Sequence, residues 1–484
     1  MTKNNKSIGR KLITDIGVLS IVDISKKVIS LLFIPLLINS NTIEKYGIYA
    51  QLIAVSSLFV FFSTLGLQRS IIYQSQKSED DASTVFYSLL PVTVLFSLVV
   101  SILVHTLSSK MSVYFLGSAS FRYAFVVASI VIFSRSIFKL TENSYKAVSR
   151  TKASAVADLA RRIIVFSSMG ISIFFFGYEF KKTLFVFGLS ELLTMASFLT
   201  GCFFRFGMPE FDFDILRSGV NYGVPLSISA FFANSSARID RLLLGYFLGP
   251  ASVGVYDIAY QISSGIVMFS QPVMDGLFPE FSNLLNNGRH KECSSYLSAG
   301  IEYFLILAIP AAMGIYIIND DLVRIVANPE LAGKTGILVI FISSGMIFHG
   351  INRIYSSIVT AAGRTRIEMS INATAAVANV ALNALLIKQF GIIGAAYATV
   401  MTYAFSATIM QRASDQIVES QVNFSLIGKA IISALIMVYI ANYNYNNANM
   451  LYDIVTSSFI YFAVLCILES RFRNKVRQSL DILK

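Results

Sequence analysis

Cysteine, histidine, tryptophan and charged residues are scarce in this chain, and each shortage excludes a class of protein. The 484 residues include three cysteines, three histidines and no tryptophan. Cys202, Cys293 and Cys466 stand alone, without a CxxC pair or neighbouring histidines, which argues against a disulfide framework or a metal site. Charged residues make up 14% of the chain, whereas soluble domains carry about 25%. We therefore expect no metal, no cofactor and no ordinary soluble domain.

The sequence also lacks the short motifs of common catalytic sites. No Walker A loop, GxSxG elbow or HExxH helix occurs. No segment between the apolar runs is long enough to fold as a separate catalytic domain. The Asn319–Asp321 triplet is better explained as a helix cap or an exposed turn than as a glycosyltransferase motif. We expect no catalytic residues, and this favours a transporter over an enzyme.

Apolar residues fill the chain from end to end. They account for 55% of it, the mean hydropathy is +0.65, and segments of 18 or more mostly apolar residues recur. Because a membrane span needs about 20 such residues, these segments predict an all-α polytopic membrane protein with fourteen transmembrane helices. The expected helices span 11–38, 43–74, 82–108, 119–148, 151–177, 182–204, 217–248, 251–285, 291–318, 333–362, 365–388, 391–412, 423–441 and 450–470.

Basic residues give the chain a net charge of +11, which by itself would suit a nucleic-acid partner. They lie in short turns and inside helices, however, so we expect no nucleic acid. Turns rich in lysine and arginine alternate with poorer ones, and the richer set includes 150–152 and 471–477. By the positive-inside rule this set is cytoplasmic, which predicts that both termini are cytoplasmic. Lys26 and Lys27 interrupt the first apolar stretch, so we expect a retained helix rather than a cleaved signal peptide.

The chain contains an internal repeat. YGIYAQ at 46–51 resembles VGVYDIAYQ at 253–261, and AVSRTK at 147–152 matches AAGRTR at 361–366. Repeated halves of a membrane protein usually surround a central cavity and rock to give alternating access. We therefore expect two pseudo-symmetric six-helix lobes around a central cavity, followed by a C-terminal helix pair. The expected parts are 1–204 (first lobe), 205–216 (cytoplasmic linker), 217–412 (second lobe) and 413–484 (helix pair and basic cytoplasmic tail).

A stripe of charge follows one face of the expected helix 119–148. Arg135, Lys139, Glu142, Lys146 and Arg150 recur at helical spacing. A charge at mid-bilayer depth costs roughly 2.5–3.5 kcal/mol, so this face should look into protein or water. We expect Arg135 and Lys139 to line the cavity, and Lys146 and Arg150 to form its cytoplasmic rim.

The repeat provides partners for the deeper pair. Its second register aligns Arg135 with His349 and Lys139 with Arg353, so we expect these four residues to form facing basic walls. Lys26 and Lys27 lie near the middle of the first helix, where they either reach the cavity or form a local pair with the preceding aspartate. The candidate substrate-binding residues are Lys26, Lys27, Arg135, Lys139, His349 and Arg353.

Other charges lie within apolar segments. Asp240 and Arg241 are embedded in RIDRLLLGYFLG, where we expect a salt bridge that fixes the two halves. Glu302, near the middle of its helix, is a candidate proton carrier. The candidates for ion coupling or salt bridges are Glu142, Asp240, Arg241 and Glu302. The charged residues that we expect at an interfacial helix end are Asp158, Arg161 and Arg162.

Three runs carry a family resemblance. They are RIDRLLLGYFLGPASVGVYDIAYQ at 238–261, PEFSNL at 279–284 and AAGRTRIEMSINATAAVANVALNALLIKQFGIIGAAYATVMTY at 361–403. These runs resemble polysaccharide flippases of the multidrug/oligosaccharidyl-lipid/polysaccharide exporter superfamily. Within the superfamily, the chain is most similar to the Wzx-type O-antigen flippases. The resemblance covers nearly the whole chain.

The resemblance implies fourteen helices in two lobes and a basic central cavity. It implies passage of an undecaprenyl-pyrophosphate-linked oligosaccharide between leaflets of the bacterial cytoplasmic (inner) membrane, with or without ion coupling. Further implied partners are membrane lipids, a polysaccharide polymerase and a chain-length regulator. Three alternatives stay open: a drug/cation antiporter, which would need acids in its cavity, a lipid II flippase, and a membrane glycan polymerase, which usually carries a large outer loop.

Overall fold

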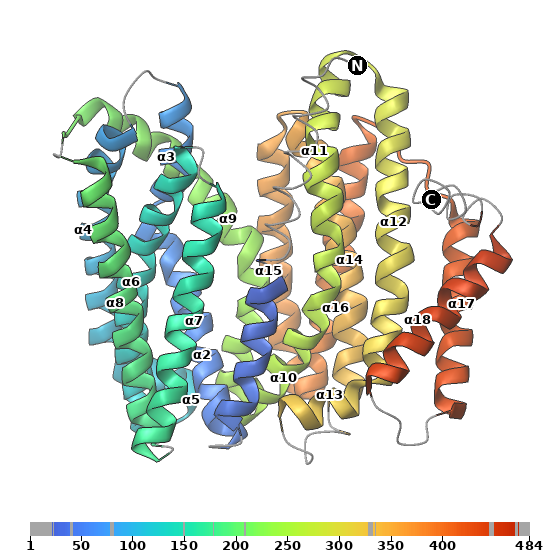
Figure 1. The fold of residues 1–484 in the computed structure, drawn as a ribbon, viewed down its shortest axis with the longest axis horizontal. Coiled ribbons are helices and arrows are strands. Elements are labelled where there is room, and N and C mark those ends of the chain that lie inside the picture. The colour runs from blue at the N-terminus through green and yellow to red at the C-terminus, as the bar shows by residue number, and fades with distance from the viewer. Residues whose placement is uncertain are drawn as a thin grey trace. The chain divides into compact units, whose positions relative to one another are not determined.

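The computed structural model is all-α, and Figure 1 shows its helices coloured in chain order. The structure describes residues 22, 24–38, 42–77, 82–148, 151–177, 179–207, 210–327, 333, 335–444, 450–469 and 473. Within these residues no strand occurs, and nine helices are long and apolar enough to cross a membrane. The prediction of an all-α polytopic membrane protein is thereby confirmed. The basic N-terminal residues, Arg150 and most of the basic C-terminal tail lie outside the described residues.

Every expected segment contains helical residues in the structure. Residues 24–38 are helical within the first segment. The later α-helices are α2 (Ile43–Thr64), α3 (Leu67–Lys77), α4 (Ala82–Thr106), α5 (Ser108–Leu116), α6 (Arg122–Ala147), α7 (Thr151–Phe176), α8 (Phe180–Phe206), α9 (Phe213–Leu248), α10 (Pro250–Ser263), α11 (Ser270–Asn286), α12 (His290–Ile317), α13 (Asn319–Val326), α14 (Gly336–Ala361), α15 (Thr365–Phe390), α16 (Ile392–Asp415), α17 (Phe424–Asn444) and α18 (Met450–Leu468). The 3₁₀ helices are η1 (Ala119–Phe121) and η2 (Ser264–Phe269).

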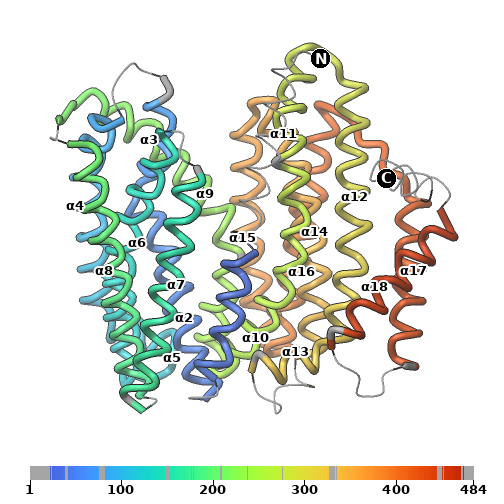
Figure 2. Tube along the Cα trace, viewed as in Figure 1, coloured from blue at the N-terminus to red at the C-terminus, as the bar shows by residue number. Residues whose placement is uncertain are grey.

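The chain divides into two compact units, which are described separately. Unit 1 comprises Met1–Asp257 and Asn383–Ile392, and unit 2 comprises Ile258–Leu382 and Ile393–Lys484. In unit 1, α6 is the central helix and packs against α2, α4 and α8 (Figure 1). In unit 2, α12 packs against α14 and α17, and α17 packs against α18 (Figure 2).

Two expected helices are interrupted, one in each half of the repeat. The segment expected at 43–74 breaks between α2 and α3, where Leu65 (φ 47°) and Gly66 (φ 72°) adopt left-handed backbone conformations. A Cβ on Gly66 would lie 2.0 Å from the carbonyl oxygen of Gly223, so only glycine fits there. The segment expected at 251–285 is divided by η2 into α10 and α11. The expectation of one continuous helix in each segment is therefore corrected.

The matched glycines of the repeat lie where α2 and α10 cross within unit 1. A Cβ on Gly47 would lie 1.7 Å from the carbonyl oxygen of Pro250, and a Cβ on Gly254 would lie 2.6 Å from that of Ile43. The approach is reciprocal, because each glycine admits the backbone of the other helix. The two glycines therefore match in structure as well as in sequence, and both are required by close packing.

Equivalent contacts also join α6 to α7 in the first half and α14 to α15 in the second half. Glu142 of α6 accepts hydrogen bonds from Lys146 Nζ (3.0 Å) and from Ser154 Oγ of α7 (3.2 Å), both at Oε1. In unit 2 the carboxylate comes from the other helix. Glu368 of α15 accepts from Ser356 Oγ at Oε1 and from Thr360 Oγ1 at Oε2, both of α14 and both at 2.7 Å.

These contacts, here called the carboxylate clasps, confirm the register that aligns AVSRTK with AAGRTR. That register pairs Glu142 with Ser356, Lys146 with Thr360, and Ser154 with Glu368. The same two helices are thus joined by one carboxylate and one serine, with the two residue types exchanged between the halves. Glu142, a candidate for ion coupling or a salt bridge, therefore forms a salt bridge with Lys146 within a contact between helices.

Candidate functional site

A buried carboxylate on α8 organises the strongest charge cluster of unit 1. Glu191 is 1% exposed. Its Oε1 accepts from Arg135 Nε (3.0 Å) and Nη2 (2.7 Å), and Arg161 Nη1 donates to Oε1 (2.9 Å) and Oε2 (3.0 Å). One carboxylate thus holds arginines from α6 and α7 in fixed positions, because bonds between charged groups are shorter and stronger than neutral ones.

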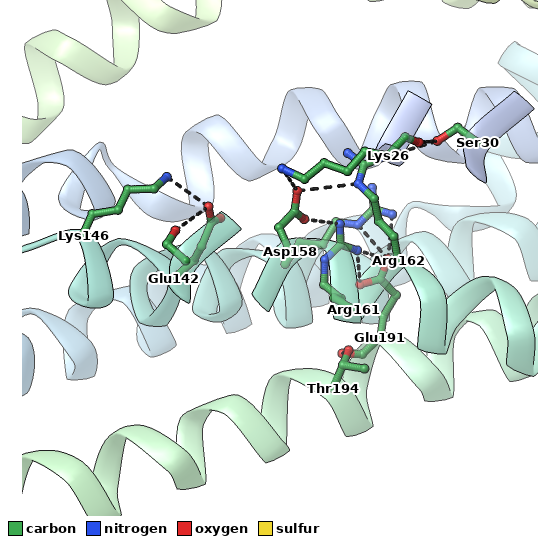
Figure 3. Close-up of polar contacts among 11 residues, drawn as sticks. Lys26, Ser30, Glu142, Lys146, Asp158, Arg161, Arg162, Glu191 and Thr194 are labelled. Atoms are coloured by element: carbon green, nitrogen blue, oxygen red, sulfur yellow. Dashed lines mark hydrogen bonds and ion pairs between the residues drawn. The ribbon is translucent and has the colours of Figure 1, made fainter. Parts of the chain in front are cut away.

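A second carboxylate extends the cluster towards the first helix (Figure 3). Asp158 Oδ1 accepts from Arg161 Nη2 at 2.9 Å, and Asp158 Oδ2 lies 3.1 Å from Lys26 Nζ and 3.6 Å from Arg162 Nε. Arg162 Nη1 also donates to Ser30 Oγ at 3.2 Å. Asp158 therefore links α7 to the helical residues 24–38. One set of ion pairs thus joins four helices, namely residues 24–38, α6, α7 and α8.

This cluster carries more positive than negative charge. We call it the basic network, and its members are Lys26, Arg135, Asp158, Arg161, Arg162 and Glu191. Four cations meet two carboxylates, which leaves two positive charges in excess. The six side chains together thus present a net positive charge, so an anion that approached them would be stabilised.

Exposure separates the members of the basic network into two groups. The side chains of Arg161 and Glu191 are 10% and 1% exposed, so they form its framework. Those of Lys26, Arg135 and Arg162 are 16%, 21% and 33% exposed. These three cations remain accessible to a ligand while their carboxylate partners hold them in place.

The structure brings together some of the predicted residues and adds others. Lys26 and Arg135 belong to the basic network; Lys27 is half-buried beside Lys26, and Lys139 is exposed one turn along α6 from Arg135. The sequence assigned Asp158, Arg161 and Arg162 to an interfacial helix end, but Arg161 is buried within the network. Glu191 was not predicted at all. Its signal was a lone acid in the apolar run FGLSELLT, which implies a buried cationic partner.

Of the embedded pair Asp240 and Arg241, Arg241 forms a buried salt bridge, and its partner is Asp257. Arg241 Nε donates to Asp257 Oδ1 on α10, and Tyr46 OH on α2 donates to Asp257 Oδ2 at 2.6 Å. Asp240 Oδ1 instead accepts from Asn383 Nδ2 on α15 at 2.8 Å. These buried contacts join α2, α9, α10 and the end of α15, and they favour a role in positioning helices.

In unit 2 the predicted binding residues have neutral partners. The ring of His349 stacks on that of Tyr403, with centroids 4.7 Å apart and an interplanar angle of 25°. Arg353 donates to Gln271 Oε1 and, at 3.4 Å, to Ser270 Oγ. The counterparts of Arg135 and Lys139 therefore lie among aromatic, amide and hydroxyl groups.

The repeat register explains this difference. Carried without gaps, it replaces the other charged members of the network on α7 and α8 by neutral residues on α15 and α16. The replacements are Asn372 for Asp158, Ala375 for Arg161, Ala376 for Arg162 and Phe405 for Glu191. The basic network thus belongs to the first half alone.

Glu302 on α12 is bound to the chain segment that precedes α17. Its Oε1 accepts from the backbone N–H of Asn423 at 2.9 Å, and the hydroxyl of Ser298 accepts from the N–H of Gln421 at 2.8 Å. A carboxylate at a helix start is stabilised by the unsatisfied N–H groups there. These contacts favour a role in anchoring α17 over the predicted role as a proton carrier.

Family models and curated proteins match this sequence. A family model described as polysaccharide biosynthesis protein matches residues 42–329, and one described as lipid II flippase MurJ matches 242–463. The probable low-salt glycan biosynthesis flippase Agl15 of Haloferax volcanii is 27% identical over 226 residues, which cover 47% of this chain and 48% of that protein. The probable flippase AglR of the same organism is 26% identical over 261 residues, which cover 51% and 53%. The chain thus spans about half the length of these curated relatives.

Among solved structures, the chain is similar to the lipid II flippase MurJ in its inward closed conformation. The TM-score is 0.77 and the identity 15%, over 95% of this chain and 99% of that one. At this identity the likeness shows the fold, and it extends over nearly all of both chains.

Proposed function

The chain belongs to the polysaccharide biosynthesis protein family, and from this membership we propose that it is a flippase that moves a lipid-linked glycan precursor across a membrane. The basic network is the observation that carries this proposal, because it holds two excess positive charges in a unit built of apolar helices. Moving an intact lipid breaks no bond, so the protein acts as a transporter and not as an enzyme. The names of the two archaeal relatives, both flippases, support the same class.

In this proposal the anionic end of the substrate binds the accessible cations of unit 1. A diphosphate diester carries two negative charges, which match the excess charge of the basic network. Lys26, Arg135 and Arg162 contact the phosphate oxygens, while Arg161 and Glu191 keep Arg135 in position. Such contacts are stronger in a water-poor site than in bulk water. Lys27 and Lys139 add further positive charge, and in unit 2 His349 and Arg353 remain candidate substrate-binding residues.

The finer features of the proposal follow from the resemblance in sequence. The substrate is an undecaprenyl-pyrophosphate-linked repeat unit of O-antigen or another surface polysaccharide, and the membrane is the bacterial cytoplasmic membrane with both termini inside. Transport proceeds by alternating access of lobes 1–204 and 217–412, and a polymerase and a chain-length regulator act after it. Each half contains an interrupted helix, at Leu65–Gly66 and at η2, and this supports a transporter because broken helices are typical of substrate pathways.

A second candidate substrate is lipid II. The observation that favours it is the MurJ family model, which matches residues 242–463. Lipid II also carries a diphosphate, so the basic network serves either substrate. A drug/cation antiporter is disfavoured, because an excess of positive charge repels cations.

Transport by reconstituted protein tests the proposal. Vesicles that contain the full chain receive a polyprenyl diphosphate oligosaccharide with a fluorescent sugar, and a membrane-impermeant quencher reports its arrival in the other leaflet. We expect Arg135→Gln and Arg162→Gln each to lower the initial rate about tenfold or more, since a charge-assisted hydrogen bond contributes about 1.5–3 kcal/mol. Arg289→Gln is the matched control, because Arg289 pairs with Glu292 and its side chain is 54% exposed.

Two comparisons give this experiment its specificity. A polyprenyl monophosphate sugar should be transported more slowly than the diphosphate, because it carries one negative charge fewer. Lipid II in the same vesicles separates the two candidate substrates. The proposed function fails if wild-type protein accelerates neither diphosphate lipid, and the assigned site fails if both arginine variants transport at the wild-type rate.

A further inference from the structure

The C-terminal helix pair contains a cavity that the proposed transport does not use. It lies between the end of α17 and the beginning of α18, and its volume is about 380 Å³. Apolar side chains make up most of its lining, among them Ile440, Phe459 and Ile460. Asp453 and Thr456 are its main polar side chains. An apolar groove with one acidic group at a defined place is suited to an amphiphilic ligand.

Asp453 lacks a complete set of partners within the described residues. The residue is 8% exposed, and its Oδ2 atom is buried without a hydrogen-bond partner there. The nearby hydroxyl of Thr456 donates to the carbonyl oxygen of Tyr452 at 2.7 Å, so its hydrogen is already engaged. Both residues line the cavity with acceptor groups, and a buried carboxylate oxygen without a donor is costly. The ligand that this arrangement favours is a cation with N–H groups.

The other end of the same helix pair supplies a contrast. There Lys429 of α17 bonds to Glu469, the residue that follows α18, at 2.8 Å. At that end of the helix pair, Glu469 is thus paired with a lysine of the same two helices. At the other end, the described residues provide no cation for Asp453 Oδ2. A ligand bound here would supply the cation that the described residues of the pair do not provide for Asp453 Oδ2.

The position of Asp453 indicates where that cation originates. Asp453 lies in the first turn of α18, at the positive end of the helix dipole. Tyr439, Tyr443 and Tyr452 are exposed at the same end of the pair, and exposed tyrosines of membrane helices concentrate at the level of the lipid headgroups. From Asp453 the cavity follows α18 to Ile460, a rise of about 10 Å into the apolar layer. A headgroup at Asp453 would therefore place an acyl chain along Phe459 and Ile460.

We propose that this cavity binds a phospholipid with a primary ammonium headgroup, of the phosphatidylethanolamine type, whose amine donates to Asp453 while one acyl chain lies along Phe459 and Ile460. A net anionic headgroup without an amine is repelled by the carboxylate. A choline headgroup is cationic but has no N–H to donate. The site lies outside the basic network and does not depend on the proposed transport.

Native mass spectrometry of the full-length protein, with lipids of identical chains, tests this site. We expect phosphatidylethanolamine to bind about tenfold tighter than phosphatidylcholine or phosphatidylglycerol, the effect of one charge-assisted hydrogen bond. Asp453→Asn should remove this preference, and Thr456→Val should reduce it without unfolding the pair. Glu469→Gln is the matched control, since it removes an acid at the far end of the same pair and should leave the preference unchanged.

Three results would overturn the proposal. The first is equal binding of the three phospholipids by wild-type protein. The second is an unchanged preference in both Asp453→Asn and Thr456→Val. The third is equal competition by ethanolamine, which has no acyl chain, because it would assign the cavity to soluble amines. Stronger competition by dodecylamine than by ethanolamine supports a site for amphiphiles.

Discussion

Exchanging the two residues of one carboxylate clasp is the sharpest test of the internal repeat. Glu142→Ser removes the acceptor of Ser154 and Lys146, whose bonds are 3.2 and 3.0 Å long. The side chain of Lys146 is 34% exposed, so its i,i+4 pair contributes only about 0.3–0.5 kcal/mol. The bond from Ser154 to a part-buried carboxylate contributes about 1.5–3 kcal/mol. We therefore expect Glu142→Ser to lower the free energy of unfolding by about 2 kcal/mol.

The reverse substitution alone should also destabilise the protein. Ser154→Glu places a second carboxylate beside Glu142, where like charges repel. The double variant Glu142→Ser/Ser154→Glu reproduces the arrangement of unit 2, in which Glu368 accepts from Ser356 and Thr360 at 2.7 Å. In that arrangement Lys146, which takes the place of Thr360, can pair with the new carboxylate. We expect the double variant to recover most of the lost stability.

A double-mutant cycle measures this recovery. Unfolding of the four purified proteins in one detergent gives the coupling energy, which we expect to be favourable by about 2 kcal/mol, within the range of about 0.5–3 kcal/mol for residues in contact. The mirror cycle, Ser356→Glu with Glu368→Ser, serves as the control and should give a coupling of the same sign. Additive effects in both cycles would refute the equivalence of the clasps.

Three further predictions concern packing, the basic network and α17. Gly47→Ala should destabilise the protein by several kcal/mol in unfolding assays, because the new Cβ would lie 1.7 Å from the carbonyl oxygen of Pro250. Gly428→Ala is the control: a Cβ there has no atom within 4 Å, so this variant should be neutral or stabilising by up to about 1 kcal/mol. Glu191→Gln should lower the free energy of unfolding by about 3–5 kcal/mol, because it leaves two arginines without their shared carboxylate. Adding Arg135→Gln should restore part of the loss. Equal stability of Glu191→Gln and wild type would contradict the network. Glu302→Gln keeps the hydrogen-bond acceptor at the start of α17 and should transport at the wild-type rate. Glu302→Ala removes this acceptor and should accelerate hydrogen exchange of the backbone amides at the start of α17. Loss of transport in both variants would instead favour a role of Glu302 in ion coupling.

The sequence predicts the helices well because their signal is local. An apolar run of sufficient length must form a helix in a membrane, since no water satisfies its backbone groups. The interruptions were missed because they depend on contacts between helices. Gly66 is held against Gly223, which is distant in the chain. Partners of buried charges are also set by packing: Arg135 was predicted as a binding residue from its spacing, but no local pattern links it to Glu191.

The repeat separates the features that the fold requires from those that function uses. Matched glycines, interrupted helices and carboxylate clasps recur in both halves, so each serves a packing problem that both halves must solve. The basic network occurs in one half only, and the other half shows that the same helices fold with Ala375 and Phe405 in place of Arg161 and Glu191. Buried ion pairs cost desolvation and are not needed to hold these helices together. Their presence in the first half alone therefore agrees better with the proposed anionic ligand than with a role in stability.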